Sequence, residues 1–217
     1  MRGRVQGAFT ESDVMLLLTL LLGCGDAAGP SMNHPAMTAA EVPVHAFDEM
    51  FIDMMVPHHQ GAVAMAVIAN ERAEHPEIKA MAGGIITSQE AEIATMKGWR
   101  KAWFGSDDTP AMGTPMAHAK MPGMAEMPGM SSMTHMATDI EGLKTATPFD
   151  LAFLDAMIPH HEGAVMMAQA CADKAQHDEV KSLAADIIRD QEKEIGQMRE
   201  WRTAWYPTAP AISVAAH

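Results

Sequence analysis

Apolar residues recur at helical spacing from residue 57 to residue 103, and one predicted turn divides this stretch in two. Within residues 57–74 they fall three or four positions apart, and residues 77–103 carry a second stripe of the same kind. His75-Pro76 interrupts the pattern, because the residue before a proline avoids helical dihedrals. The stretch is therefore predicted to be a helical hairpin.

The pattern of this hairpin returns later in the chain. Residues 47–104 and 149–206 are identical at half of their paired positions, and Met55, for example, recurs as Met157. Neither hairpin can cover its apolar face alone, whereas packing the two together buries both faces. The repeat predicts an all-α fold: a pseudo-twofold four-helix bundle made of two repeated helical hairpins, joined by a long Met-rich crossover linker.

Charge and composition narrow the class of protein. A chain of 217 residues with 48% apolar content can bury one compact domain and carry flexible flanks. Its formal net charge of -13 would repel a polyanion and attract cations, so no nucleic acid partner is predicted. Methionine is the outlier, with 22 residues against a single tyrosine. Because methionine also fills gaps in soft cores, its position in the chain must distinguish a packing role from a functional one.

The N-terminal part of the chain looks like a bacterial lipoprotein signal. An apolar run from Val14 to Leu22, too short to span a bilayer, leads into Gly23-Cys24. On that resemblance Cys24 becomes the lipidated first residue of the mature protein, and a periplasmic or extracytoplasmic, membrane-anchored location is expected. Cys171 would then have no cysteine partner for an intramolecular disulfide.

Composition divides the chain into six segments. They are a lipoprotein signal segment at 1–24, a flexible tether at 25–46, the first hairpin repeat at 47–105, a Met/His-rich linker at 106–147, the second hairpin repeat at 148–207, and a disordered tail at 208–217.

The linker is too long for a bundle loop, and loops of that length are usually functional or disordered. Its Pro, Gly and Ser content favours neither helix nor strand. It carries candidate metal ligands with no sustained apolar period: Met112, Met116, His118, Met121, Met124, Met127, Met130, Met133, His135 and Met136.

A second group of candidate ligands lies on the first helix of each hairpin. On a helix, Met157 precedes His160 and His161 by three and four residues, so its thioether lies between the two imidazoles. Adjacent histidines are about 100° apart around the axis, so we expect only one of each pair to point directly into the bundle. Pro57 and Pro159 either kink a longer helix or begin one. The candidates are Met55, His58, His59, Met65, Met157, His160, His161 and Met167.

These residue types favour copper. Thioether sulfur is neutral and soft, so it binds Cu(I) far better than Mg or Ca and without proton competition, and imidazole suits both Cu(I) and Cu(II). In an oxidising compartment, methionine also avoids the disulfide chemistry that cysteine ligands would risk. Copper is therefore the predicted metal, with Cu(I) preferred and Cu(II) possible. The alternative for the linker is a spacer that drifted in composition.

Structural roles compete with metal binding on the helices. A buried histidine is commonly satisfied by a carboxylate, and Cys171 is as consistent with a small buried hydrophobe as with a ligand. His75 and His177 lie at the hairpin turns, and a role in the turn is expected for them. Carboxylates available to the histidines are Asp53, Glu92, Asp155 and Glu194. Trp99, Trp103, Trp201 and Trp205 are expected to be core and interface anchors.

The repeated Pro-His-His motif carries a resemblance to a known family. Met-Ile-Pro-His-His-Glu-Gly-Ala-Val, its near copy in the first repeat, and the downstream Gln-Glu with Trp-Arg-x-x-Trp are similar to the bacterial family called domain of unknown function 305, over nearly all of residues 47–206. The resemblance implies a ferritin-like four-helix bundle, exported or periplasmic, with copper binding and resistance as in its copper-binding members. It implies metal ligands at the eight helix positions above, with the linker methionines as additional candidates.

The predicted function is that of an extracytoplasmic copper-binding protein that sequesters or delivers Cu(I) or Cu(II) and contributes to copper homeostasis or resistance. Expected partners are the metal ion, the membrane through lipidated Cys24, and copper-exporting or copper-accepting proteins. A ferritin-like metal oxidoreductase is one alternative, although the Glu-x-x-His motif of carboxylate-bridged sites does not occur and no catalytic residues can be assigned. A structural lipoprotein bundle without metal is the other.

Overall fold

The computed structural model describes residues 46–111 and 140–212, which lie within one unit of the chain, Ala40–His217. Its helices in chain order are α1 (Ala46–Arg72), α2 (Pro76–Phe104), α4 (Ile140–Thr145), α5 (Phe149–Ala172) and α6 (Asp178–Trp205). These two ranges contain no strand, so the predicted all-α class is confirmed. No helix in them combines the length and the apolar character needed to cross a bilayer.

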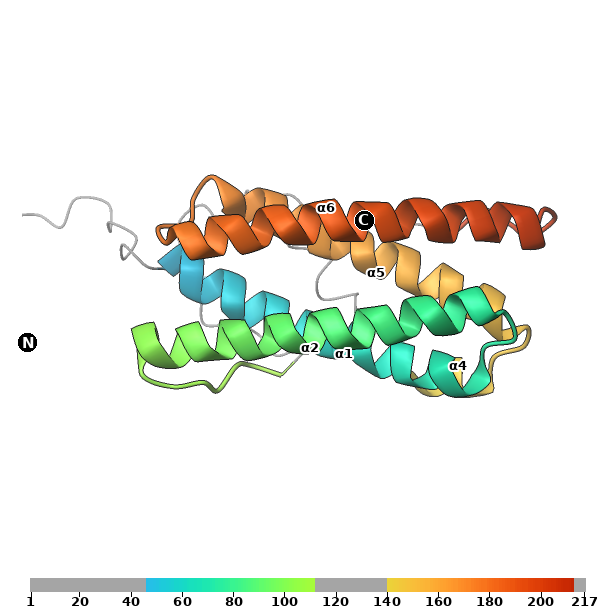
Figure 1. Cartoon of the computed structure of the whole chain (residues 1–217), viewed down its shortest axis with the longest axis horizontal. Helices are drawn as coiled ribbons and strands as arrows, with labels where there is room; N and C mark the ends of the chain where they lie inside the picture. The colour runs from blue at the N-terminus through green and yellow to red at the C-terminus, as the bar shows by residue number, and fades with distance from the viewer. Residues whose placement is uncertain (1–45, 112–139, 213–217) are drawn as a thin grey trace, which may run out of the picture. The chain divides into compact units, whose positions relative to one another are not determined.

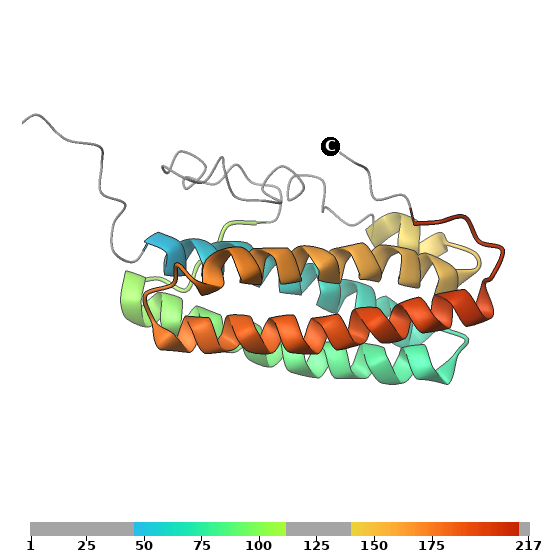
Figure 2. The same cartoon turned by 90° about the horizontal axis from the view of Figure 1, so that it is seen from above.

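The two hairpins pack against each other through their first helices. α1 contacts both α2 of its own hairpin and α5 of the other, while α5 also contacts α6. In Figure 1, α2 and α6 run along the near side and α1 and α5 run behind them, and Figure 2 shows the same helices from above. The predicted bundle of two repeated hairpins is confirmed, with α1 and α5 as its inner helices.

The turn before each second helix has the backbone that the sequence requires. His75 is extended (φ -81°, ψ 128°), and Pro76 follows in the first turn of α2, where a missing N–H is tolerated. His177 adopts the same conformation before α6 (φ -82°, ψ 130°). α2 ends at Gly105, whose φ of 87° is left-handed, and the Gly105 N–H donates to the carbonyl oxygen of Lys101.

The prolines of the repeated motif lie inside longer helices. α1 continues through Pro57 and α5 continues through Pro159. The alternative in which each helix begins at its proline is therefore wrong. The turns upstream carry Phe51 and Phe153, which are 1% and 0% exposed, so their burial in the core outweighs the backbone hydrogen bond that each proline removes.

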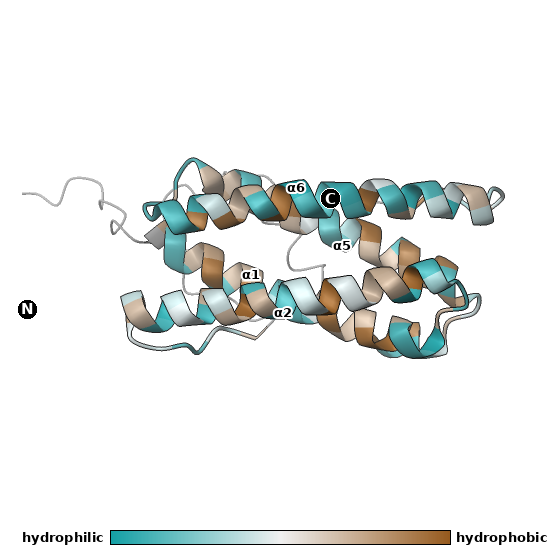
Figure 3. Cartoon of the chain, in the orientation of Figure 1, coloured by the Kyte–Doolittle hydropathy of each residue, from teal (hydrophilic) through white to brown (hydrophobic). Residues whose placement is uncertain are grey.

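Burial differs between inner and outer helices. Figure 3 shows α6 as mostly hydrophilic, and its buried residues form one row at spacings of three and four: Val180, Ala184, Ile187, Gln191, Ile195 and Met198. α5 is buried around much more of its circumference. This is the pattern expected when a helix packs against two neighbours instead of one.

The short helix α4 corrects the prediction for the linker. Its composition favours neither helix nor strand, yet Ile140–Thr145 are helical. Leu143 is 4% exposed in the core, and Arg72 at the end of α1 donates to the carbonyl oxygens of Leu143 (2.8 Å) and Lys144 (2.6 Å). These contacts with α1 stabilise a helix of six residues that has little stability by itself.

Two buried aspartates tie each hairpin to the turn of the other. Asp150 on α5 accepts hydrogen bonds from the backbone N–H groups of Glu74 and His75, at 3.0 and 2.9 Å, and its Oδ2 is 2.6 Å from His75 Nδ1. Asp48 on α1 binds the α5–α6 turn in the same way. Both carboxylates are at most 1% exposed.

We expect Asp150→Ala to lower the free energy of unfolding by about 2–4 kcal/mol, because the buried turn donors lose a charged acceptor. Chemical denaturation followed by circular dichroism measures this change. Asp178→Ala is the control, since the Asp178 carboxylate is exposed and pairs with Lys181 on the same helix; its unfolding midpoint should stay close to that of the wild type. Equal midpoints for the two variants would contradict the role of Asp150.

Candidate metal centre

Four histidines of the repeated motif are buried where α1 and α5 meet. His58 and His160, here called the inner histidines, are 5% and 3% exposed, and their ring centroids are 3.8 Å apart. His59 and His161, the outer histidines, are both 0% exposed. Each outer ring lies 6.4 to 6.5 Å from the inner ring beside it in the sequence. The repeat thus brings four imidazoles into one cluster.

Both members of each histidine pair point into the bundle, so the expectation that only one would do so is wrong. The inner histidines meet at the contact between α1 and α5, whereas the outer histidines reach α2 and α6. Since α1 lies against both α5 and α2, two directions about 100° apart around its axis are both interior. The same holds for α5, which lies between α1 and α6.

Each outer histidine pairs with a glutamate of its own hairpin. His59 Nε2 is 2.6 Å from Glu92 Oε2, and His161 Nε2 is 2.8 Å from Glu194 Oε2. The glutamate side chains are 20% and 26% exposed, while both imidazoles are fully buried. A carboxylate at one ring nitrogen fixes the orientation of the ring and leaves the other nitrogen, Nδ1, for a further partner.

The inner histidines have no hydrogen-bond partner at either ring nitrogen among the residues that the structure describes. Burial, followed by the neighbouring imidazoles, holds the pKa of both well below the usual value, so both rings are neutral near pH 7. A buried polar group without a partner costs about 1–3 kcal/mol. A neutral imidazole offers a lone pair to a metal ion, so these nitrogens fit the predicted copper.

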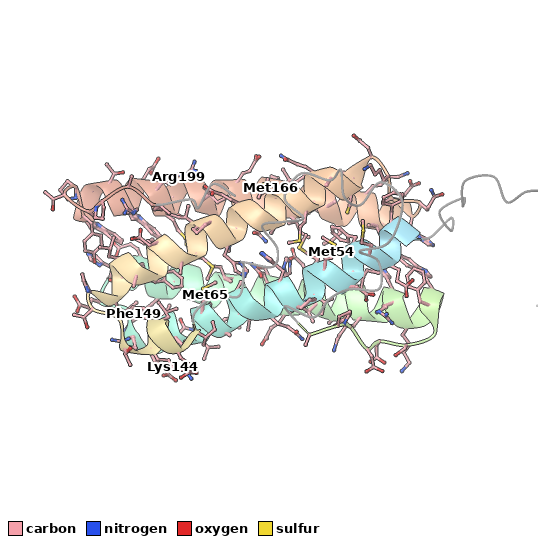
Figure 4. The ribbon with its side chains drawn as sticks, turned by 180° about the vertical axis from the view of Figure 1, so that it is seen from behind. Met54, Met65, Lys144, Phe149, Met166 and Arg199 are labelled. Carbon is pink, nitrogen blue, oxygen red and sulfur yellow. The ribbon has the colours of Figure 1, made fainter. Side chains whose placement is uncertain are left out.

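Each of the two core clusters contains one predicted methionine ligand from each hairpin. Met65 and Met157 belong to one core cluster, and Met55 and Met167 belong to the other. All four are at most 5% exposed. Figure 4 shows Met54 and Met65 at successive points along α1, with Met65 nearer to α4. Each end of the α1–α5 contact therefore receives one predicted ligand from each hairpin, whereas the sequence groups the ligands within a repeat.

The aspartates of the motif pair with arginines on the second helix of their own hairpin. Asp53 accepts a hydrogen bond from Arg100 Nε at 2.6 Å, and Asp155 pairs with Arg202 in the equivalent position. Hydrogen bonding to Asp53 raises the pKa of Arg100. Among the described residues, Glu92 and Glu194 are the carboxylates that pair with histidines of the motif, as the sequence allowed.

Cys171 lies in the same core cluster as Met55 and Met167 and is 0% exposed. Burial raises the pKa of its thiol to about 12, so the thiol is protonated at neutral pH. Its surroundings are those of a small buried hydrophobe.

Asp48 and Asp150, which bind the turn histidines, were not identified as functional by sequence reasoning. The available signal is their equivalent position in the two repeats. The ring of His75 stacks on Trp205 with centroids 3.7 Å apart, and His177 stacks on Trp103 at 3.6 Å. These contacts thus join the two hairpins to each other at their turns, and none of them involves the four histidines of the cluster.

Other predicted ligands and segments fall outside the described residues. This applies to the signal segment, to Cys24, and to every linker candidate: Met112, Met116, His118, Met121, Met124, Met127, Met130, Met133, His135 and Met136.

Carboxylate-rich metal binding finds no support in the part of the chain that is described. Within residues 46–111 and 140–212, no three His, Cys, Asp or Glu side chains form a group that could hold a metal ion.

A family model described as Domain of unknown function (DUF305) matches residues 48–202. The structures of CopM in its Cu(I)-bound and Cu(II)-bound forms are 41% and 44% identical to this chain. Each match covers 73% of this chain and 97% of the CopM chain, with a TM-score of 0.61.

Two further relatives come from named organisms. One is a DUF305 protein from Streptomyces coelicolor, described as a secreted protein, whose crystal structure is 29% identical to this chain. The match covers 73% of this chain and 91% of the Streptomyces chain, with a TM-score of 0.59. Uncharacterized protein L153 of Acanthamoeba polyphaga mimivirus is 39% identical over 49 residues, which are 23% of this chain and 32% of L153. The chain thus matches less than half the length of L153.

Proposed function

Since the chain belongs to the DUF305 family, we propose that it binds copper at the buried histidine cluster and at the methionines beside it. The observation that carries the proposal is the pair of inner histidines, which hold neutral, buried ring nitrogens without partners among the described residues. The similarity to CopM, whose structures contain Cu(I) and Cu(II), supports the choice of metal.

His58 and His160 would supply imidazole nitrogen, and the methionines of the two core clusters would supply thioether sulfur. Sulfur and neutral nitrogen together favour Cu(I), while the imidazoles also accept Cu(II). Glu92 and Glu194 would act one step away from the ion, by fixing the rings of the outer histidines. The linker methionines and histidines between Met112 and Met136 would offer further soft ligands.

In this proposal copper is the cargo of the protein. The chain would be exported, lipidated at Cys24, and would sequester copper or deliver it to exporting or accepting proteins outside the cytoplasm. Methionine and histidine suit that compartment, because neither forms disulfides. The role would be one in copper homeostasis or resistance, and we propose no catalytic step.

We expect Met167→Leu to weaken Cu(I) binding by about tenfold, equal to about 1.4 kcal/mol, because leucine keeps the volume but lacks the sulfur. Anaerobic titration against a chromophoric Cu(I) chelator measures the affinity. Met166→Leu is the matched control, since Met166 directly precedes Met167 on α5 and is 38% exposed, against 5% for Met167. Equal affinities for the two variants would remove Met167 from the site.

A further inference from the structure

A groove lies between the outer helices α2 and α6. It has a volume of about 490 Å³ and is lined from α2 by Glu77, Gly84 and Ser88 and from α6 by Asp190, Lys193 and Glu194, among others. The hairpins meet mainly through α1 and α5, which Figure 1 shows behind the two outer helices. The groove, here called the α2–α6 groove, therefore lies on the side of the bundle away from the α1–α5 contact.

Glu194 belongs both to this groove and to the histidine cluster. Its side chain is 26% exposed, and its Oε2 is 2.8 Å from Nε2 of His161, which is 0% exposed. The ring of His161 lies 6.4 Å from that of His160, one of the inner histidines. One carboxylate and one imidazole thus separate the groove from the inner pair.

Among the described residues, the hollow at the repeat-related position has a different lining. A second hollow of about 570 Å³ lies at the repeat-related position, between Trp99 of α2 and Ser182 and Asp186 of α6. Its lining does not include Glu92, the counterpart of Glu194. The counterpart of Asp186 in the α2–α6 groove is Gly84, which has no side chain to occupy the groove.

We infer that metal ions enter the bundle through the α2–α6 groove and pass from Glu194 to His161 and then to the inner histidines. The inference rests on the proposed copper-binding function. The charged groups that line the groove are three carboxylates and one lysine, and Arg189 pairs with the carboxylate of Asp190. The groove keeps a net negative charge, so its field attracts cations, as does the net charge of -13. Carboxylate oxygen is a poor ligand for a soft ion, so Glu194 would hold the ion only in transit, while nitrogen and sulfur inside retain it.

Gly84 allows the groove to be filled without touching a ligand. A Cβ atom at Gly84 would meet no atom within 4 Å, and the same is true of Gly98 on the same helix. Gly98 does not line the groove. Gly84→Leu and Gly98→Leu therefore add the same side chain to exposed positions of α2 and raise its helix propensity equally, but only the first obstructs the groove.

The test mixes the full chain with Cu(II) sulfate in a stopped-flow instrument and follows the quenching of tryptophan fluorescence. Signal that persists in a His58→Leu/His160→Leu variant reports binding elsewhere and is subtracted. We expect Gly84→Leu to slow association by about tenfold and dissociation by a similar factor, so that affinity and stoichiometry stay unchanged, because an obstructed route affects both directions. Gly98→Leu should bind at the wild-type rate.

The possible failures are distinct. If Gly84→Leu binds the full amount of copper at the wild-type rate, or if Gly98→Leu is slowed equally, the route is overturned while the proposed function stands. If none of the proteins shows copper binding that depends on the inner histidines, the proposed function fails, and the route fails with it.

Discussion

Replacing His58 and His160 together by leucine is expected to stabilise the metal-free bundle and to remove its copper site. In the metal-free protein the ring nitrogens of both residues are buried, and none has a partner within the described residues. Leucine is close to histidine in volume and has no polar atoms, so it can fill the same space without that penalty. We expect the free energy of unfolding to rise by about 2 kcal/mol.

Copper should then lose its effect on stability. A metal ion that binds only the folded state raises the unfolding midpoint, so anaerobic Cu(I) should raise the midpoint of the wild type and leave that of the double variant nearly unchanged. Urea denaturation followed by circular dichroism, with and without Cu(I), measures both effects. A double variant that is less stable than the wild type without metal would instead identify the inner histidines as packing elements.

His75→Leu provides the opposite pattern and serves as the control. His75 is bound to Asp150 and stacks on Trp205, so its loss should destabilise the protein. It lies in the turn between α1 and α2, away from the inner histidines, so stabilisation by Cu(I) should remain. If the two variants respond to copper alike, the histidine cluster is not the site.

The fold could be predicted from the sequence because its determinants are local and occur twice. The spacing of apolar residues gives the helices, and His75-Pro76 gives the turn, since both depend on backbone preferences of a few neighbouring residues. The repeat then requires two hairpins that bury complementary faces. By contrast, the helicity of Ile140–Thr145 depends on contacts with Arg72 and on the burial of Leu143, which no local pattern reveals.

The site could be predicted in its residue types but not in its pairing. Periodicity tells which residues share a helix face, but not which helix that face meets. The sequence therefore grouped Met55 with Met65, whereas the structure places them in different core clusters. It also allowed Asp53 or Glu92 as the partner of His59, and only the packing of α1 on α2 selects Glu92.

The bundle tolerates the cost of the unpaired nitrogens in the histidine cluster because other contacts stabilise the fold. Asp48 and Asp150 tie the two hairpins together at their turns, and the Asp53–Arg100 pair joins α1 to α2. Such contacts can stabilise a fold that includes a costly group at its centre, as is common where polar groups are kept for binding. The outer contacts thus hold the four imidazoles in place before any metal ion arrives.

The metal-free protein is expected to lose stability steeply as the pH falls below about 6.5, the usual pKa of histidine. Burial, and after it the neighbouring imidazoles, keeps the pKa of His58 and His160 well below that value in the folded state. Well above pH 6.5 both states are neutral at these residues, so the two histidines add no pH dependence there. Below it the unfolded chain takes up protons that the folded protein excludes, and acid therefore favours unfolding.

Two such groups change the free energy of unfolding by up to about 2.7 kcal/mol per pH unit, so a loss of about 2–3 kcal/mol is expected between pH 7 and pH 5.5. Urea denaturation at a series of pH values measures the slope. His58→Leu/His160→Leu cannot take up these protons and should show a much flatter profile over the same range. Bound Cu(I) should protect the wild type, because the ion occupies nitrogen lone pairs that protons would need. Identical slopes for the metal-free wild type and the double variant would show that the inner histidines do not set its acid sensitivity.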